Sequence, residues 1–272
     1  MSKNFIVAIA NSTLMPRRAA AGNSADVNRL RPYVEGALTF TGWDLDRIAP
    51  KRIGPGLPWD YGRRARELLA QAPSVLDLGT GGGELFAELC TGYHGRAIAS
   101  EPWAVNAPIA KRRLSRLEID VVRAHSLRLP FQSEAFDLVL DRHEELDPDE
   151  VHRVLRRGGS LLTQQIGQNE WNELRPFFPR MQDFGPLLDR YVSGLQQTGM
   201  TVGVAKTHDI RSAYRGLGEL VYLLCISPWT IPDFDPLGKD LAALLQVEDR
   251  LVAQEGLILT ESRFIIEARK MT

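Results

Sequence analysis

The feature that most constrains this chain is one glycine-rich stretch, Val75-Leu76-Asp77-Leu78-Gly79-Thr80-Gly81-Gly82-Gly83-Glu84. An apolar run leads into it, and a segment with helical spacing follows. Glycine adopts positive φ at little cost and lets a ligand come close to the backbone. The stretch therefore predicts a strand, a ligand-binding turn and a helix in direct succession.

Two common phosphate-binding loops do not fit this stretch. In a dinucleotide loop, G-x-G-x-x-G, the last glycine counted from Gly79 would fall at Glu84, whose charge suits a pyrophosphate poorly. The P-loop requires a Gly-Lys-Ser/Thr ending, which is absent. The remaining pattern is D-x-G-x-G-x-G, formed by Asp77, Gly79, Gly81 and Gly83.

Strands and helices alternate downstream of this turn, which implies a mostly parallel sheet covered on both faces. The predicted strands are 74–78, 97–100, 119–122, 136–140 and 160–166. The predicted helices are 63–72, 84–90, 104–117 and one that starts after Asp147. Asp147 and Pro148 suit the cap and first position of that helix, Glu150 can bond back to the cap, and Gly158-Gly159 should end it.

The regular alternation weakens after Gly167. We expect a helix at 187–198, a strand at 201–207 and a last strand at 263–269. The long segment 209–256 between the last two strands reads as an inserted helical cap. Residues 1–60, with one predicted helix at 25–40, form an N-terminal lid before a main domain of residues 61–272.

The charge and the cysteine content indicate which binding partners and which cellular compartment to expect for this chain. The 272 residues include 33 Lys plus Arg and 34 Asp plus Glu. The chain therefore lacks the strong positive charge that is typical of a nucleic-acid-binding domain. Only Cys90 and Cys225 are present, which favours a reduced, cytoplasmic setting over a disulfide framework. No run approaches the ~20 apolar residues of a membrane span, and the run 5–10 is short for a signal peptide.

The D-x-G-x-G-x-G pattern resembles the first motif of class I S-adenosylmethionine-dependent methyltransferases. The resemblance implies a Rossmann-like sheet of seven mostly parallel strands, with helices on both faces and the last strand antiparallel. It also implies S-adenosylmethionine as cofactor and S-adenosylhomocysteine as product. Asp77 would lie near the cofactor's ammonium group, and the turn residues Gly79, Thr80, Gly81 and Gly83 would approach the cofactor.

Two later segments extend the cofactor prediction. Glu101 follows the second strand, 22 residues after Gly79, where a carboxylate can accept both ribose hydroxyl protons. Pro102 could then pack on the adenine. The stretch from Arg123 to Leu140 resembles the family's "GDAxxLPFxxxxFDLV" segment, with His125 at the position of the usual acid. A neutral His125 could accept the adenine bond, and backbone groups of Ser126 and Leu127 are the alternative.

The cluster Asp141-Arg142-His143-Glu144 follows the fourth strand, so it should lie near the cofactor's reactive methyl group. We expect Asp141 and Arg142 to line the cofactor, His143 to act as general base, and Glu144 to orient it or replace it. In the alternative interpretation, Arg142 and Glu144 form only a surface ion pair. The spacing does not match H-E-x-x-H, so no metal is predicted.

The acceptor side is predicted from aromatic and amide residues that flank the expected cleft. These are Trp59, Tyr61, Gln164, Trp171, Tyr222 and Trp229. The segments around Trp59, Tyr61, Gln164 and Trp229, together with Arg142-His143-Glu144, also resemble a group of uncharacterised bacterial methyltransferases.

Three functions compete at this point. The first is methyl transfer to an oxygen or nitrogen of a small molecule. The second is methylation of an RNA base, for which two basic clusters could supply a binding rim. The third is a protein that binds S-adenosylmethionine without methylating. The clusters are Arg63, Arg64 and Arg66, and Lys111, Arg112, Arg113 and Arg116, and they read more simply as solvated helix faces. The sequence gives no oligomeric state.

Overall fold

The computed structural model describes residues 24–271 except 44, 46, 47 and 49. The short apolar run at 5–10 lies outside the described residues. Among the described helices, none has the length and apolar character needed to cross a bilayer.

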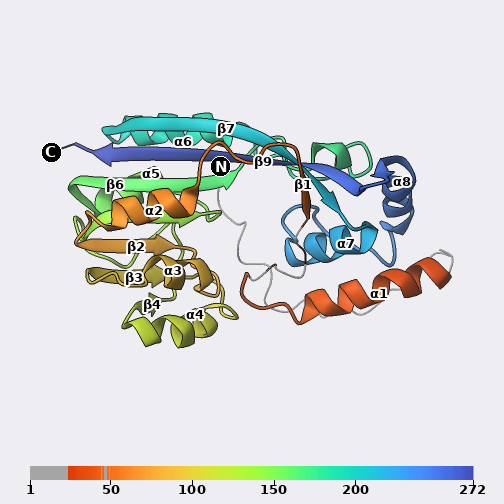
Figure 1. The fold of residues 1–272 in the computed structure, drawn as a ribbon, viewed down its shortest axis with the longest axis horizontal. Coiled ribbons are helices and arrows are strands. Elements are labelled where there is room, and N and C mark those ends of the chain that lie inside the picture. Colours follow the sequence, from red (N-terminus) through yellow and green to blue (C-terminus); the bar gives the residue numbers. More distant parts are fainter. Residues whose placement is uncertain (1–23, 44, 46–47, 49, 272) are drawn as a thin grey trace.

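A nine-stranded sheet forms the centre of the molecule (Figure 1). Its order is β1-β7-β9-β6-β5-β2-β3-β4, and β8 pairs with β9. The strands from β4 to β6 in this order are parallel, whereas β9 is antiparallel to both β6 and β7. This confirms the expected mostly parallel sheet with an antiparallel last strand, to which the short strands β1 and β8 are added. The strands are β1 Lys51–Ile53, β2 Ser74–Leu78, β3 Arg96–Ser100, β4 Asp120–Val122, β5 Phe136–Arg142, β6 Leu155–Ile166, β7 Met200–Tyr214, β8 Val252–Ala253 and β9 Gly256–Lys270.

Helices cover both faces of the parallel part of the sheet. Side chains of α2, α3 and α4 pack on one face, and those of α5 and α6 pack on the other. All five positions of β2 are buried, as expected for a strand covered on both sides. The helices are α1 Ser24–Leu38, α2 Tyr61–Leu69, α3 Glu84–Leu89, α4 Ala107–Leu114, α5 Pro148–Val154, α6 Leu187–Gln197, α7 Leu217–Ile226 and α8 Leu241–Leu251. Two 3₁₀ turns occur at Ser115–Leu117 and Asn172–Leu174.

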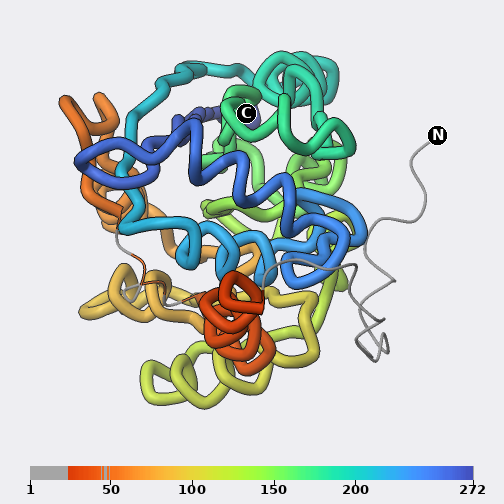
Figure 2. Tube along the Cα trace, turned by 90° about the vertical axis from the view of Figure 1, so that its right-hand side faces the viewer, coloured from red at the N-terminus to blue at the C-terminus, as the bar shows by residue number. Residues whose placement is uncertain are grey.

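The strands β7 and β9 extend well beyond the end of β6. Their outer halves pair from Asp209 opposite Ser262 to Tyr214 opposite Leu257. A third hydrophobic core, from α1, α7, α8 and the loops around them, packs on this extension. Figures 1 and 2 both place α1 beside α7. The predicted insertion at 209–256 therefore begins later, because its first six residues are strand, and we call residues 215–255 the cap.

The start of α5 agrees with its sequence signal, but its end does not. Asp147 accepts hydrogen bonds from the backbone N–H groups of Asp149 and Glu150 at 2.9 and 3.2 Å. The helix ends at Val154 and not at Gly158-Gly159, because β6 already begins at Leu155 and pairs with β5. Sheet pairing overrides the local glycine signal here, and the register of β5 and β6 shifts between Phe136 and Leu138.

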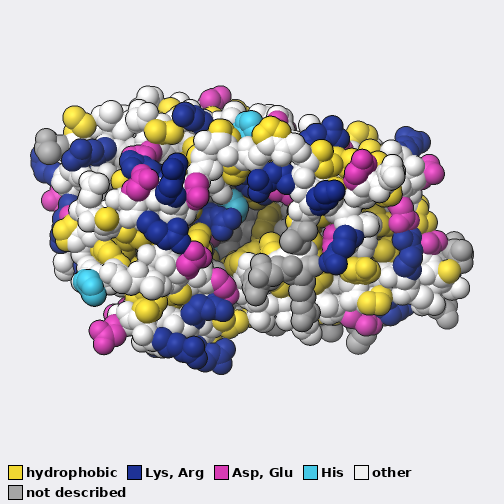
Figure 3. All heavy atoms as spheres, in the orientation of Figure 1, with side chains coloured by type: hydrophobic (Ala, Val, Ile, Leu, Met, Phe, Trp, Pro, Cys, Tyr) yellow, Lys and Arg dark blue, Asp and Glu magenta, His cyan; other side chains and the backbone are white. Residues whose placement is uncertain are grey.

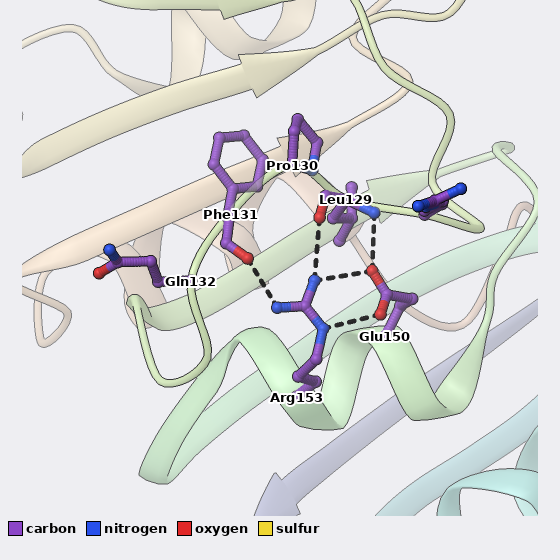
Figure 4. A pocket seen from close by; sticks show the side chains of 7 residues that line it. Leu129, Pro130, Phe131, Gln132, Glu150 and Arg153 are labelled. Carbon is purple, nitrogen blue, oxygen red and sulfur yellow. Dashed lines mark hydrogen bonds and ion pairs between the residues drawn. The ribbon is translucent and has the colours of Figure 1, made fainter.

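The connection between β4 and β5 is fastened to α5 by one arginine (Figure 4). The Arg153 guanidinium donates to both carboxylate oxygens of Glu150 at 2.7 and 2.8 Å. It also donates to the carbonyl oxygens of Leu129 and Phe131. In return, Glu150 accepts from the Leu129 N–H and does not bond back to the helix cap. These residues line an open pocket of about 460 Å³.

Candidate functional site

The glycine turn joins the carboxyl end of β2 to α3. Gly79, Gly81 and Gly83 have φ values of 59°, 61° and 78°, a region that disfavours side chains. A Cβ atom on Gly79 would come within 2.6 Å of Glu144, and one on Gly81 would collide with the Trp43 indole. The turn therefore requires glycine for backbone shape and for space, as the sequence pattern indicated.

Glu101 lies directly against this turn. Its side chain is buried, at 3% exposure, and accepts hydrogen bonds from the N–H groups of Gly81 at 2.7 Å and Trp103 at 2.9 Å. Burial raises the pKa of Glu101 to about 7. The structure thus brings together the two segments that the 22-residue spacing linked, and Pro102 after them is buried.

Asp77 is the second buried carboxylate at this edge. Burial, with the nearby charge of Glu101, raises the pKa of Asp77 to about 7. Within the described residues, neither carboxylate forms an ion pair. Buried acids without a cation are costly when ionised, so this pair is suited to a ligand that supplies positive charge or hydroxyl donors.

The loop after β4 contributes a buried hydroxyl. Ser126 is buried, and its Oγ donates to Glu144 Oε1 at 3.1 Å. His125 and Leu127 on either side are exposed. The choice between the His125 imidazole and backbone groups for an adenine contact therefore stays a prediction.

Asp141 shapes the turn that follows β5. It is fully buried and accepts hydrogen bonds from Thr163 Oγ1 at 2.9 Å and Gln165 Nε2 at 2.8 Å. It also accepts from the Glu144 N–H at 3.2 Å. Burial, followed by the charge of Glu144, raises its pKa well above the usual range. The structure places Asp141 beneath the turn, where it supports His143 and Glu144.

His143 occupies a strained position at the end of β5. Its φ is 70°, which is uncommon for a residue with a side chain and often marks functional sites. Its N–H donates to the Gln164 carbonyl at 2.9 Å. The residue is exposed. Desolvation by the neighbouring protein, and then the charges of Arg263 and Arg142, lower the His143 pKa well below its usual value. The imidazole is therefore neutral at pH 7 and can accept a proton.

Glu144 lies across the glycine turn. Burial, then the charge of Glu101, raises the pKa of Glu144 to about 7. Its carboxylate bonds to Ser126 and lies against Gly79. Within the described residues it forms no ion pair with Arg142, so the structure does not show the surface pair considered from the sequence.

Four of the predicted residues meet on the α2 side of the sheet. Arg142 on β5 stands directly opposite Gln164 on β6. Gln164 Oε1 accepts a hydrogen bond from Trp59 Nε1 at 2.8 Å. The Tyr61 hydroxyl is buried, meets no hydrogen-bond partner among the described residues, and has a pKa raised mainly by burial. This cluster sits next to Asp77, whose charge acts on both Tyr61 and Arg142.

A second aromatic group gathers three separate segments. Trp43, Trp103 and Trp229 have ring centroids 5.7 to 6.4 Å apart. Phe40 joins Trp43 to Tyr222 on α7 at 5.5 and 6.0 Å. Sequence reasoning placed Trp229 and Tyr222 at the site but missed Phe40 and Trp43, because no local spacing connects them to the glycine turn. The backbone of the lid is held here by Gly42 N–H, which donates to Asn106 Oδ1 at 2.9 Å.

Trp171 is not brought into this site. It is buried in the third core, stacks edge-on with Tyr214 at 6.4 Å and donates from Nε1 to the Tyr214 hydroxyl at 3.3 Å. Its backbone N–H bonds to the Thr260 carbonyl on β9. Its position makes it a packing residue of the cap and not a wall of the site.

The space-filling view shows a hollow between the sheet region and the α1–α7 region (Figure 3). The arrowheads of β2 and β6 point toward this gap in Figure 1. We call it the central hollow. In the described part of the chain, no group of three metal-ligating side chains is found.

Comparison with known proteins agrees with this geometry. Residues 75–164 match a family model described as a methyltransferase domain. A search of curated proteins finds no match to the chain.

Three solved structures share the fold at low sequence identity. A functionally unknown protein from Deinococcus radiodurans gives a TM-score of 0.59 at 14% identity, covering 91% of this chain and 100% of its own. A candidate methyltransferase from Bacillus halodurans gives 0.57 at 15% identity, covering 76% and 99%. The [4+2]-cyclase SpnF gives 0.52 at 14% identity, covering 92% and 95%.

Proposed function

This chain carries an S-adenosylmethionine-dependent methyltransferase domain of the class I, Rossmann-like fold, and from that premise we propose that it methylates an oxygen or nitrogen of a small molecule. The observation that carries the proposal is the arrangement at the strand ends. A neutral His143 lies close to Arg142 and Arg263, and Arg142 in turn stands opposite Gln164 and close to the buried acid Asp77.

The residues of the turn suit the cofactor in chemistry and shape. Asp77 is a buried acid that forms no ion pair within the described residues, which suits it to an ammonium group. Glu101 keeps unused acceptor capacity for ribose hydroxyls, since each oxygen accepts one hydrogen bond from the protein. Gly79 and Gly81 carry no side chain, so other groups can come close to their backbone, as Glu144 and Trp43 do here. We assign these residues to the cofactor.

S-adenosylmethionine supplies a methyl group on a positively charged sulfur, which keeps the electron pair of the broken bond, so an acceptor O–H or N–H must release one proton. We infer that His143 takes that proton, and a neutral, exposed imidazole supports this role. Glu144 is the alternative base. Asp141 positions both by holding the Glu144 N–H.

Charge pairing supports a small acceptor over RNA. In the first basic cluster, Arg64 pairs with Glu267 at 2.5 Å, and Arg66 pairs with Glu88 at 2.5 Å. In the second, Arg113 pairs with Glu84. Arginines paired with carboxylates have less net charge to offer a phosphate backbone, although Lys111, Arg112 and Arg116 form no ion pair within the described residues. The two cysteines, Cys90 and Cys225, are both free, and on this ground we propose a reducing, cytoplasmic setting for the protein.

One fold neighbour gives specific reason to keep a non-methylating function as the second candidate. SpnF is named a [4+2]-cyclase, and a fold alone does not determine the reaction that it hosts. Turnover must therefore be tested separately from cofactor binding.

The experiment is isothermal titration with S-adenosylhomocysteine, followed by a methyl-transfer screen on small phenols, amines and carboxylic acids. We expect micromolar or tighter binding and transfer to at least one acceptor. Absence of binding would refute the whole assignment. Binding without transfer to any acceptor, or with transfer only to RNA, would refute the small-molecule proposal.

A further inference from the structure

A row of polar residues crosses the carboxyl ends of four neighbouring strands. In the spatial order β3, β2, β5 and β6, it consists of Glu101, Asp77, Arg142 and Gln164. The last three share the sheet face covered by α2, because each lies two positions from a residue of the core on that face. These core residues are Val75, Leu140 and Leu162.

The order of this row separates two functions. The acids Glu101 and Asp77 on β3 and β2 are assigned above to the ribose and ammonium of the cofactor. Arg142 and Gln164 lie one and two strands farther along, and adjacent strands are about 4.8 Å apart. This end of the row therefore faces the acceptor side of the reacting methyl group.

Arg142 is the unusual member of the row. Its side chain donates no hydrogen bond and forms no ion pair within the described part of the chain. The residue is exposed at the carboxyl end of β5, so a ligand can reach its guanidinium. The nearby cation Arg263 disfavours the charge of Arg142, and a bound anion would favour it.

Gln164 adds neutral donors beside this cation. Its Oε1 is committed to the Trp59 indole N–H, which fixes the amide orientation. Its Nε2 group donates no hydrogen bond among the described residues, so both protons are available. A planar guanidinium with an adjacent amide matches a carboxylate, which accepts several hydrogen bonds in one plane.

We propose that the methyl acceptor carries a carboxylate, which Arg142 and Gln164 bind at the carboxyl ends of β5 and β6. This rests on the proposed function, and it moves Arg142 from the cofactor, where the sequence placed it, to the acceptor. Among the other charged groups near Arg142, Asp77, Glu101 and Glu144 are acids that repel a carboxylate, and the cation Arg263 is paired with Glu170 and Glu261. Arg142 therefore dictates where that group binds.

The test measures binding of matched probes, each a small aliphatic or aromatic carboxylate paired with its neutral amide. Titrations are run with and without saturating S-adenosylhomocysteine, on the wild type, Arg142→Gln, Arg142→Lys and the exposed control Arg63→Gln. We expect a carboxylate to bind the wild type more tightly than its amide. Arg142→Gln should lose that preference by about 10- to 100-fold, Arg142→Lys should lose less, and Arg63→Gln none. Absence of a preference in the wild type, or its survival in Arg142→Gln, overturns the proposal.

A second measurement separates the acceptor from the cofactor. S-adenosylhomocysteine has an amino-acid carboxylate, whereas 5′-methylthioadenosine lacks it. We expect Arg142→Gln to bind both as the wild type does. A tenfold or larger loss for S-adenosylhomocysteine alone would assign Arg142 to the cofactor and overturn the proposal. If the wild type binds no S-adenosylhomocysteine, the proposed function fails instead, while the carboxylate titrations without it still report on Arg142.

Discussion

The proposed cofactor half and the proposed acceptor half of the site are assembled in different ways. The first comes from consecutive strand ends, so Asp77, Gly81 and Glu101 lie within 25 positions of one another in the chain. The second is centred on Trp59 and Gln164, which are 105 positions apart and meet only through the fold. A local pattern thus specifies the first half, whereas tertiary packing specifies the second.

The largest expected effect concerns the cofactor half alone. Gly81→Asp should weaken S-adenosylhomocysteine binding by at least about 100-fold, because a side chain would collide with Trp43 and add a charge beside Glu101. Isothermal titration measures this. Gly92→Asp is the matched control, since Gly92 also has positive φ but has open space around it. Retained micromolar affinity in Gly81→Asp would refute the placement of the loop.

The next effect lies at the junction of the halves. His143→Ala should lower turnover by about 100-fold, as expected for loss of a general base, and leave cofactor affinity nearly unchanged. The lowered His143 pKa predicts that wild-type activity falls only below the ordinary titration range near pH 6.5, when the imidazole becomes protonated. Exposed His94→Ala is the control. Unchanged turnover in His143→Ala would remove this residue from the reaction.

A core substitution tests whether the cap is energetically separate. Leu244→Ala in α8 should cost about 2–5 kcal/mol of unfolding free energy and leave S-adenosylhomocysteine affinity unaltered, because Leu244 belongs to the third core. Leu78→Ala, just before the glycine turn, should reduce both. Urea unfolding and titration give the two quantities. A similar loss of affinity in both variants would mean that the halves are not separable.

A conservative change tests the acceptor half. Trp59→Phe removes the indole N–H that orients Gln164 and should raise the acceptor KM by roughly fivefold, the value of one hydrogen bond near 1 kcal/mol. Steady-state kinetics with the acceptor found in the screen provide the measurement. A fall in S-adenosylhomocysteine affinity instead would place Trp59 with the cofactor.

The smallest effect is a pH dependence of the free protein. Burial raises the pKa values of Asp77 and Glu101 from their ordinary values near 4 to about 7, so stability is lost as the pH rises between these values, where only the unfolded chain releases the protons. We expect the Tm without ligand to fall between about pH 4 and 7 and to level off above, and the fall to shrink with S-adenosylmethionine, whose positive charge stabilises the ionised acids. Equal slopes in both scans would contradict this.

The same division explains what the sequence could predict. The parallel sheet and the glycine turn followed from local patterns, and the role of Glu101 toward the ribose stays a prediction. The end of α5 was wrong because the pairing of Leu155 with Phe136 outweighs the glycines. Trp43 was missed and Trp171 was misplaced because both depend on contacts between distant segments. An isolated tryptophan gives no signal of which core it joins.

The two ends of the cap join the sheet at paired residues, and this has a consequence for how the cap can change. Residues 215–255 leave and re-enter the sheet at neighbouring points, since Tyr214 lies opposite Leu257. Gly256, at φ 117°, leaves no room for a side chain against the Tyr214 carbonyl, so this junction is narrow. The connection of the cap to the sheet is narrow, but its packing is broad, because α1 and residues 171–181 share its core. A change inside the cap therefore reaches the N-terminal helix before it reaches the strand ends.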